Sequence, residues 1–135
     1  MSPPVRGLTE VVLWTRDLKR SLSFYQSLFG LPHITPPEPP HGILKAGDGP
    51  GGIPDMIILV PHPDPNVTFP PEKKRRVLHH IALNVEPERY EELRAACEKA
   101  GLEVRHGEHG FLKGVRTFYV DDPDGNEVEV ITTAN

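Results

Sequence analysis

Apolar and polar residues follow a pattern that occurs twice along the chain. Each copy starts with an apolar run, passes through an acidic turn and continues with apolar residues at helical spacing: TEVVLWTRDLKRSLSFYQSLFGLP from Thr9, and HHIALNVEPERYEELRAACEKAGLE from His79. Each helical stretch ends at a glycine, Gly30 or Gly101, which is a common residue just beyond a helix C-terminus. The pattern predicts a strand followed by a helix in each half.

The start of each predicted helix has its own signal. Asp17 is placed to accept a hydrogen bond from the first turn of the first helix, and Pro87 suits the first turn of the second. Apolar residues then recur on one face of each helix: Leu18, Leu22, Tyr25 and Phe29 in the first, and Tyr90, Leu93, Cys97 and Ala100 in the second.

Short strand-like segments follow each helix. They cover residues 43–46 and 56–60 in the first half, and 102–106, 115–120 and 127–132 in the second. Between the last two, the turn sequence DPDGN predicts a hairpin. We therefore expect an α+β fold of two repeated βαβββ modules, at about residues 8–60 and 78–132, joined by a linker at 61–77 within a single domain.

Length, charge and cysteine content narrow the class of protein. The chain has 135 residues, a net charge of −4 and one cysteine, Cys97, so no internal disulfide can form. No apolar run approaches the roughly 18 residues that would span a membrane, and we expect a soluble, cytoplasmic protein without a membrane partner. The basic run KKRR, from Lys73, has no aromatic residues beside it, so we interpret it as a solvated loop and expect no nucleic-acid partner.

Three motifs carry a family resemblance: VVLWTRDLKRSLSFYQSLFGL near the start, HHIALNV in the middle and FYVDDPDGNEVEV near the end. With the duplicated pattern, they resemble the vicinal oxygen chelate superfamily, which includes glyoxalase I, extradiol dioxygenases, and fosfomycin- and bleomycin-resistance proteins. The resemblance implies a curved mixed sheet around a cup, with a divalent metal ion at its base. It also implies a small-molecule substrate or ligand and a homodimer.

The same resemblance implies a set of metal ligands. It assigns them to Glu10, His80 and Glu129, although histidine is usual at the first of these positions. One imidazole and two carboxylates suit Mn, Fe, Ni or Zn. The further ligand of glyoxalase I falls near Ile58, whose aliphatic side chain cannot bind a metal.

Residues near these ligands are candidates for catalysis and substrate binding. Tyr119 precedes Glu129 at a spacing that resembles the active-site tyrosine of extradiol dioxygenases, which makes both residues catalytic candidates. Trp14, Arg116 and Tyr119 are candidates for substrate binding. Core packing is the competing role for Trp14 and Tyr119. His79 follows the alternation of a strand, so we expect it to point away from its neighbour and to be structural.

Three hypotheses about the function remain open at this point. The ligand set favours a metal-dependent lyase, isomerase or dioxygenase acting on a small molecule with neighbouring oxygens. Glutamate at position 10 favours a metal-free binding protein of the bleomycin-resistance kind, in which Glu10 and Glu129 would repel each other. A third hypothesis is a module whose cup is filled by its own side chains. Surface positions are expected for His62, His106 and His109.

Overall fold

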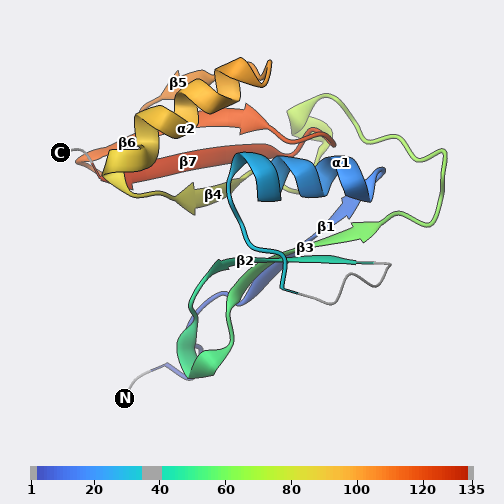
Figure 1. The fold of residues 1–135 in the computed structure, drawn as a ribbon, viewed down its shortest axis with the longest axis horizontal. Coiled ribbons are helices and arrows are strands. Elements are labelled where there is room, and N and C mark those ends of the chain that lie inside the picture. The colour runs from blue at the N-terminus through green and yellow to red at the C-terminus, as the bar shows by residue number, and fades with distance from the viewer. Residues whose placement is uncertain (1–2, 35–40, 134–135) are drawn as a thin grey trace. The chain divides into compact units, whose positions relative to one another are not determined.

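A computed structural model describes residues 3–34 and 41–133 (Figure 1). The chain divides into two compact units, Met1–Val67 and Thr68–Asn135. We describe each unit by itself. Within the described ranges, every helix is too short or too polar to cross a membrane.

The first unit contains a three-stranded mixed sheet. Its elements are β1 (Glu10–Thr15), α1 (Leu18–Leu22), the π-helical η1 (Ser23–Leu28), β2 (Gly42–Gly47), the short 3-10 helix η2 (Pro50–Gly52) and β3 (Asp55–Pro61). The strand order is β1-β3-β2, with β1 parallel and β2 antiparallel to β3. The parallel pair needs a crossover connection, and the helical segment supplies it.

The predicted first helix is present, with a change of geometry along its length. Asp17 is the N-cap, and its carboxylate accepts a hydrogen bond from the backbone N–H of Arg20 at 3.2 Å. After one short α-helical stretch the backbone continues as a π-helix, in which Phe24 and Tyr25 are both buried. Gly30 follows with a φ of 74°, a conformation that glycine adopts without strain.

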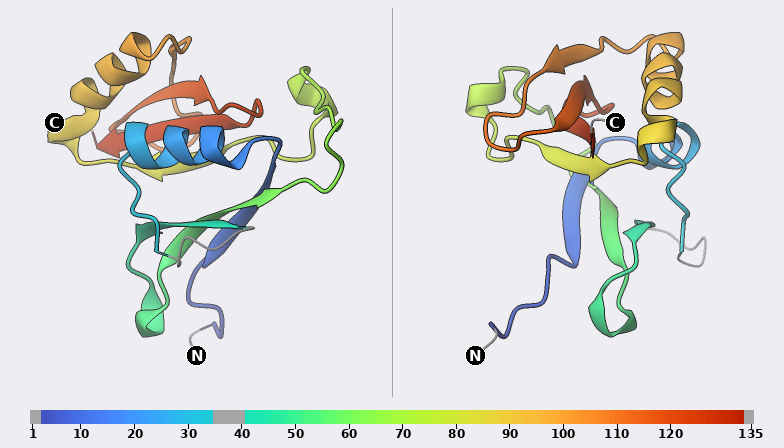
Figure 2. Two further views of the ribbon diagram at one scale, coloured as in Figure 1. Left: turned by 45° about the vertical axis from the view of Figure 1, so that its right-hand side comes forward. Right: turned by 90° about the vertical axis from the view of Figure 1, so that its left-hand side faces the viewer.

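The second unit contains a four-stranded mixed sheet and one longer helix. Its elements are η3 (Lys73–Arg75), β4 (Ile81–Asn84), α2 (Pro87–Lys99), β5 (Arg105–Gly107), β6 (Val115–Asp121) and β7 (Glu127–Thr133). The strand order is β4-β7-β6-β5, and only the β4 and β7 pair is parallel. Figure 2 shows α2 along one face of this sheet. Tyr90 of α2 packs edge-on against Phe118 of β6.

The predicted hairpin joins β6 to β7. The Asp122 carboxylate accepts hydrogen bonds from the backbone N–H groups of Asp124 and Asn126, at 2.9 and 2.8 Å. Gly125 adopts a φ of 85°, which explains why glycine occupies this position. The hairpin fixes the register in which Tyr119 lies opposite Glu129.

In each unit one sheet face forms the core with a helical segment. The buried core residues of the first unit are Leu13, Phe24, Tyr25, Leu44, Ile57 and Leu59, and those of the second are Tyr90, Cys97, Phe118, Val120, Val128 and Val130. Because side chains alternate along a strand, the residues between these core positions occupy the opposite sheet faces. The α+β class and the strand-helix-strand plan of the modules are confirmed.

Candidate metal centre

Three of the predicted site residues form one connected group in the second unit. The phenol of Tyr119 donates a hydrogen bond to Glu129 Oε2 at 3.2 Å. His80 Nε2 lies 3.1 Å from the other carboxylate oxygen, Oε1. The rings of His80 and Tyr119 are stacked, with centroids 5.9 Å apart. A side chain from β6 and one from the residue before β4 therefore meet the carboxylate of Glu129 on β7.

The electrostatics of Glu129 distinguish it from the other acids of this sheet. Its side chain is 2% exposed, and its two oxygens meet a histidine and a phenol. Among the ion pairs of residues 3–34 and 41–133, none joins it to lysine or arginine. A buried carboxylate needs a compensating positive charge. A divalent cation or a cationic ligand would supply it, and the nitrogen and oxygen donors suit a borderline metal ion.

Tyr119 is held as a neutral phenol. Burial raises its pKa, the hydrogen bond with Thr117 lowers it, and the charge of Glu129 raises it again, so that the net change is upward. A phenol that keeps its proton at neutral pH can donate to Glu129 or to an oxygen of a bound molecule. Its position is therefore compatible with both roles predicted for it.

Glu127, on the same strand, has very different surroundings. Lys73 forms an ion pair with one oxygen, and Arg105 lies 3.0 Å from the other. Arg105 also pairs with Asp121 at 2.7 Å. Burial raises the pKa of Glu127, but the hydrogen bonds and charges of Lys73 and Arg105 lower the pKa by more than burial raises it, so the net change is downward. This carboxylate is already neutralised by the protein.

These ion pairs were missed by the reasoning from sequence. The basic run that begins at Lys73 was expected to be a solvated loop, yet Lys73 reaches Glu127 and Arg76 donates to the backbone oxygen of Asp124 at 2.9 Å. Arg105 lies on an edge strand beside Tyr119. The sequence offers no signal for these contacts, since Lys73, Arg105 and Glu127 come from separate segments that meet only in the folded unit.

The position of His79 differs from the expectation. Its Nδ1 lies 2.7 Å from Nδ1 of His80, so the two rings meet instead of pointing apart. Both residues precede Ile81, the first residue of β4, and strand alternation does not govern them. His79, His80 and Glu127 offer ligand atoms within 4.8 Å of one another. Because Lys73 and Arg105 already neutralise Glu127, Glu129 is the better carboxylate partner for a cation.

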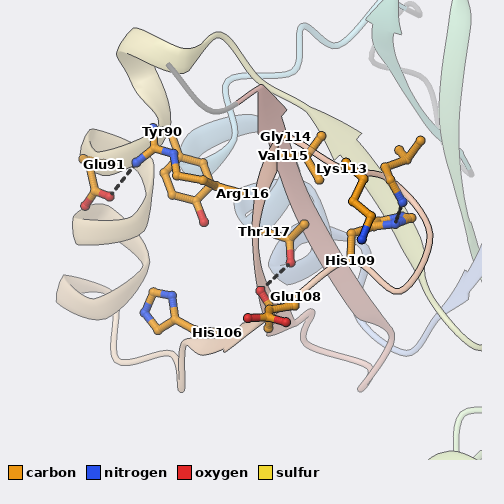
Figure 3. Close-up of a pocket in the computed structure, with 12 residues that line it drawn as sticks. Tyr90, Glu91, His106, Glu108, His109, Lys113, Gly114, Val115, Arg116 and Thr117 are labelled. Atoms are coloured by element: carbon orange, nitrogen blue, oxygen red, sulfur yellow. Dashed lines mark hydrogen bonds and ion pairs between the residues drawn. The ribbon is translucent and has the colours of Figure 1, made fainter.

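Arg116 and Tyr119 lie on opposite faces of the second sheet. The Arg116 guanidinium lies 4.5 Å from the ring centroid of Tyr90, and its Nη1 is 3.4 Å from Glu91, both on α2. Figure 3 shows Arg116 beside Tyr90 and Glu91. These residues and the loop between β5 and β6 line a pocket of about 470 Å³. Arg116 and Tyr119 are three residues apart on β6, and side chains an odd number of residues apart on a strand point to opposite faces of the sheet.

Two of the remaining histidines have local roles in loops. His109 Nδ1 accepts hydrogen bonds from the backbone N–H groups of Phe111 and Leu112, at 3.1 and 2.8 Å. His62 packs against Trp14, with ring centroids 4.8 Å apart. His106 is an exposed residue of β5. The contacts of His109 therefore stabilise the conformation of its own loop.

The first unit carries the remaining predicted residues on β1. Glu10, Val12 and Trp14 share the sheet face away from the core, as expected, and Trp14 is about half exposed at 52%. Ile58 on β3 is the register partner of Val12, so it belongs to the same face. This face is apolar apart from Glu10 and Lys45 at one end. It offers one carboxylate and an aromatic wall to a ligand.

The comparison with protein families identifies the class of protein. The chain matches the Glyoxalase/Bleomycin resistance protein/Dioxygenase superfamily over residues 7–130. It therefore belongs to this superfamily, the vicinal oxygen chelate group that the sequence motifs resemble.

A curated relative is a catechol-2,3-dioxygenase of Bacillus subtilis (strain 168), 27% identical over 121 residues. The match covers 87% of this chain and 38% of the relative, so the chain spans well under half of that protein's length.

Solved structures share the fold at low sequence identity. A glyoxalase/dioxygenase from Nostoc punctiforme has a TM-score of 0.75 at 21% identity, covering 100% of this chain and 97% of the other. A lactoylglutathione lyase from Agrobacterium tumefaciens has a TM-score of 0.64 at 22% identity, covering 96% of each chain. A fosfomycin resistance protein from Listeria monocytogenes has a TM-score of 0.67 at 19% identity, covering 96% of this chain and 95% of that one.

Proposed function

We propose that this protein is a divalent-metal-dependent enzyme that acts on a small molecule with neighbouring oxygen atoms, as a lyase, isomerase or dioxygenase. The observation that carries the proposal is Glu129, a buried carboxylate that meets His80 and Tyr119 but no lysine or arginine among the described residues. His80 and Glu129 of the second unit supply two ligands in this proposal, and the family resemblance of the sequence motifs assigns Glu10 as a further ligand. The relative from Bacillus subtilis is named for catechol, whose two hydroxyl groups are neighbours.

The protein's own side chains divide the remaining work. A bound divalent ion, Mn, Fe, Ni or Zn, would act as a Lewis acid on the neighbouring oxygens. Tyr119 keeps its proton and donates it in a hydrogen bond to a substrate oxygen, while Glu129 accepts the competing bond when no substrate is present. Trp14 is the further substrate-binding residue in this proposal, and its half-exposed ring would contact an apolar part of the substrate.

The experiment that tests this proposal compares two neighbouring carboxylates. Protein without a histidine tag is incubated with Mn, Fe, Ni or Zn, and bound metal is measured by elemental analysis and titration. Glu129→Gln and His80→Ala should each weaken metal binding by roughly 100-fold, because an amide or a methyl group replaces a side chain that binds the metal ion directly. Glu127→Gln is the matched control, and it should bind metal like the wild type, since Lys73 and Arg105 occupy that carboxylate.

Equal metal content in the wild type and both ligand variants would overturn the assignment. Wild type that takes up none of the four metals would favour the second candidate function, a metal-free protein that binds and sequesters a small molecule. The observation in favour of that candidate is the glutamate at position 10 beside the apolar residues Val12 and Trp14. In that case a cationic ligand would neutralise Glu129.

We also propose that the protein is a cytoplasmic homodimer. Each sheet ends in edge strands, β1 and β2 in one unit and β4 and β5 in the other, and a second subunit can cover such edges. Light scattering at micromolar concentration should then give twice the 15.0 kDa mass of the chain. A mass of 15.0 kDa would contradict the dimer.

A further inference from the structure

His79 and His80 are joined through their δ nitrogens. The two Nδ1 atoms are 2.7 Å apart, and the rings are tilted by 67°. At this distance one nitrogen must carry a hydrogen and the other must offer a lone pair. His79 is exposed, so nothing in the core requires its ring to lie there. The contact therefore calls for a role within the site.

The opposite nitrogen of His80 faces the carboxylate. His80 Nε2 lies 3.1 Å from Glu129 Oε1, which makes Nε2 the atom that would bind a cation shared with Glu129. A neutral imidazole carries one hydrogen, so a metal on Nε2 places that hydrogen on Nδ1. It then needs an acceptor, and His79 Nδ1 is the acceptor that the described residues provide.

We propose that His79 is a positioning residue for the metal ligand His80. It accepts the hydrogen bond from His80 Nδ1 and orients the ring so that the Nε2 lone pair points toward Glu129. Ligating histidines are usually oriented in this way by a hydrogen bond to the second ring nitrogen. The inference rests on the proposed function, since it takes His80 and Glu129 as metal ligands.

The same residues could instead use His79 as a ligand, together with His80 and Glu127. That arrangement would place a divalent cation beside Glu127 while Lys73 and Arg105 are still bound to it. Two fixed positive charges next to the ion disfavour it. The geometry therefore favours a hydrogen-bonding role, and the two roles predict different behaviour when asparagine replaces His79.

The experiment measures zinc affinity by competition with a chromophoric chelator on the untagged full chain. His79→Ala should raise the zinc dissociation constant by roughly tenfold to 100-fold, the usual effect of losing such a partner. His79→Asn should recover most of this loss, because its amide oxygen accepts a hydrogen bond but is a weak metal ligand. The matched control is His106→Ala, another exposed histidine, which should bind zinc like the wild type. Circular dichroism should be the same for all four proteins.

A second measurement detects the hydrogen itself. In zinc-loaded protein with 15N-labelled histidine, the nitrogen chemical shifts should place the His80 hydrogen on Nδ1. They should also show that His79 Nδ1 accepts a hydrogen bond and is not bound to zinc. The positioning role would be wrong if His79→Ala bound zinc like the wild type. It would also be wrong if asparagine gave no recovery and a His79 nitrogen carried the shift of a bound ligand. Wild type that takes up none of Mn, Fe, Ni or Zn would overturn the proposed function and this role together. Wild type that binds zinc, with an equal affinity in His79→Ala, would overturn this role alone.

Discussion

The two units share one plan, but their sheet faces away from the core have opposite character. In each unit the first strand runs parallel to the last one, and a helical segment makes the crossover. The exposed side of the first sheet is mainly apolar, with Val12, Trp14, Ile43, Ile58 and Val60. The corresponding side of the second sheet is ionisable, with His80, Arg105, Tyr119, Asp121, Glu127 and Glu129.

The difference teaches that a repeated backbone does not repeat its chemistry. Alternation along each strand separates core residues from the residues of the other face, so the other face can change without disturbing the core. The second unit uses this freedom to surround two carboxylates in two ways, one neutralised by lysine and arginine and one left for histidine and tyrosine. The first unit uses it to display an aromatic side chain and one carboxylate.

The largest expected effect comes from comparing a core aromatic residue with one on the open face. Phe118→Ala should lower the free energy of unfolding by about 3–5 kcal/mol, because the ring is fully buried against Tyr90 and its loss leaves a cavity. Trp14→Ala should cost less than about 1 kcal/mol, since half of that side chain is exposed. Urea denaturation of both variants measures this, and equal losses would contradict the distinction between the buried core of the second unit and the open face of the first.

A smaller effect should follow from the neutralised carboxylate of the second unit. Glu127→Gln should cost about 1.5–3 kcal/mol at pH 7, the range for hydrogen bonds to charged groups. The pKa of Glu127 is lowered in the folded protein, so its contribution is complete above the ordinary value of 4.5 and fades as pH falls through the folded value. Denaturation at pH 7 and at pH 3 should therefore show the difference between variant and wild type shrinking in acid.

The control for this prediction lies in the first unit. Asp48 pairs with Lys45 at 2.6 Å, and the hydrogen bond and charge of Lys45 lower its pKa, but Asp48 is 91% exposed. Asp48→Asn should leave the unfolding transition unchanged at both pH values, because solvent screens such a pair. A loss of stability as large as that of Glu127→Gln would erase the contrast between the units.

The proposed ligand Glu10 should contribute less to metal binding than His80 or Glu129 does. Glu10→Ala should weaken zinc binding by about tenfold, or about 1.4 kcal/mol, because His80 and Glu129 remain. Glu10→His should retain zinc, since imidazole is an equally good ligand. Chelator competition measures both. Unchanged affinity in Glu10→Ala would confine the metal ligands to the second unit.

The smallest expected effect concerns the single thiol. Cys97 is fully buried, and burial, followed by the charge of Glu98, raises the pKa of its thiol to about 11. At pH 8 only about one thiol in a thousand is then ionised, so a disulfide reagent should react with the folded protein far more slowly than with protein in urea. Rapid reaction of the folded chain would show that α2 opens from the sheet.

Much of the fold was predictable because its signals are local. The helix that begins at Pro87, the cap at Asp17 and the hairpin turn at Gly125 all depend on residues close in sequence. Period-two alternation also predicted that Glu10, Val12 and Trp14 would share a face. The change to π-helical geometry after Leu22 had no such signal, and the sequence predicted one continuous helix.

The sequence by itself also predicted His80 and Glu129 as metal ligands, through the motifs that resemble the family, and this assignment stays a prediction. The tertiary structure decided how each carboxylate is neutralised. Lys73 and Arg105 form ion pairs with Glu127 from segments far away in the chain, whereas Glu129 contacts His80 and Tyr119. The contact between His79 and His80 also required the folded chain. Charge compensation depends on distances of a few ångströms in space, which residue spacing along the sequence does not encode.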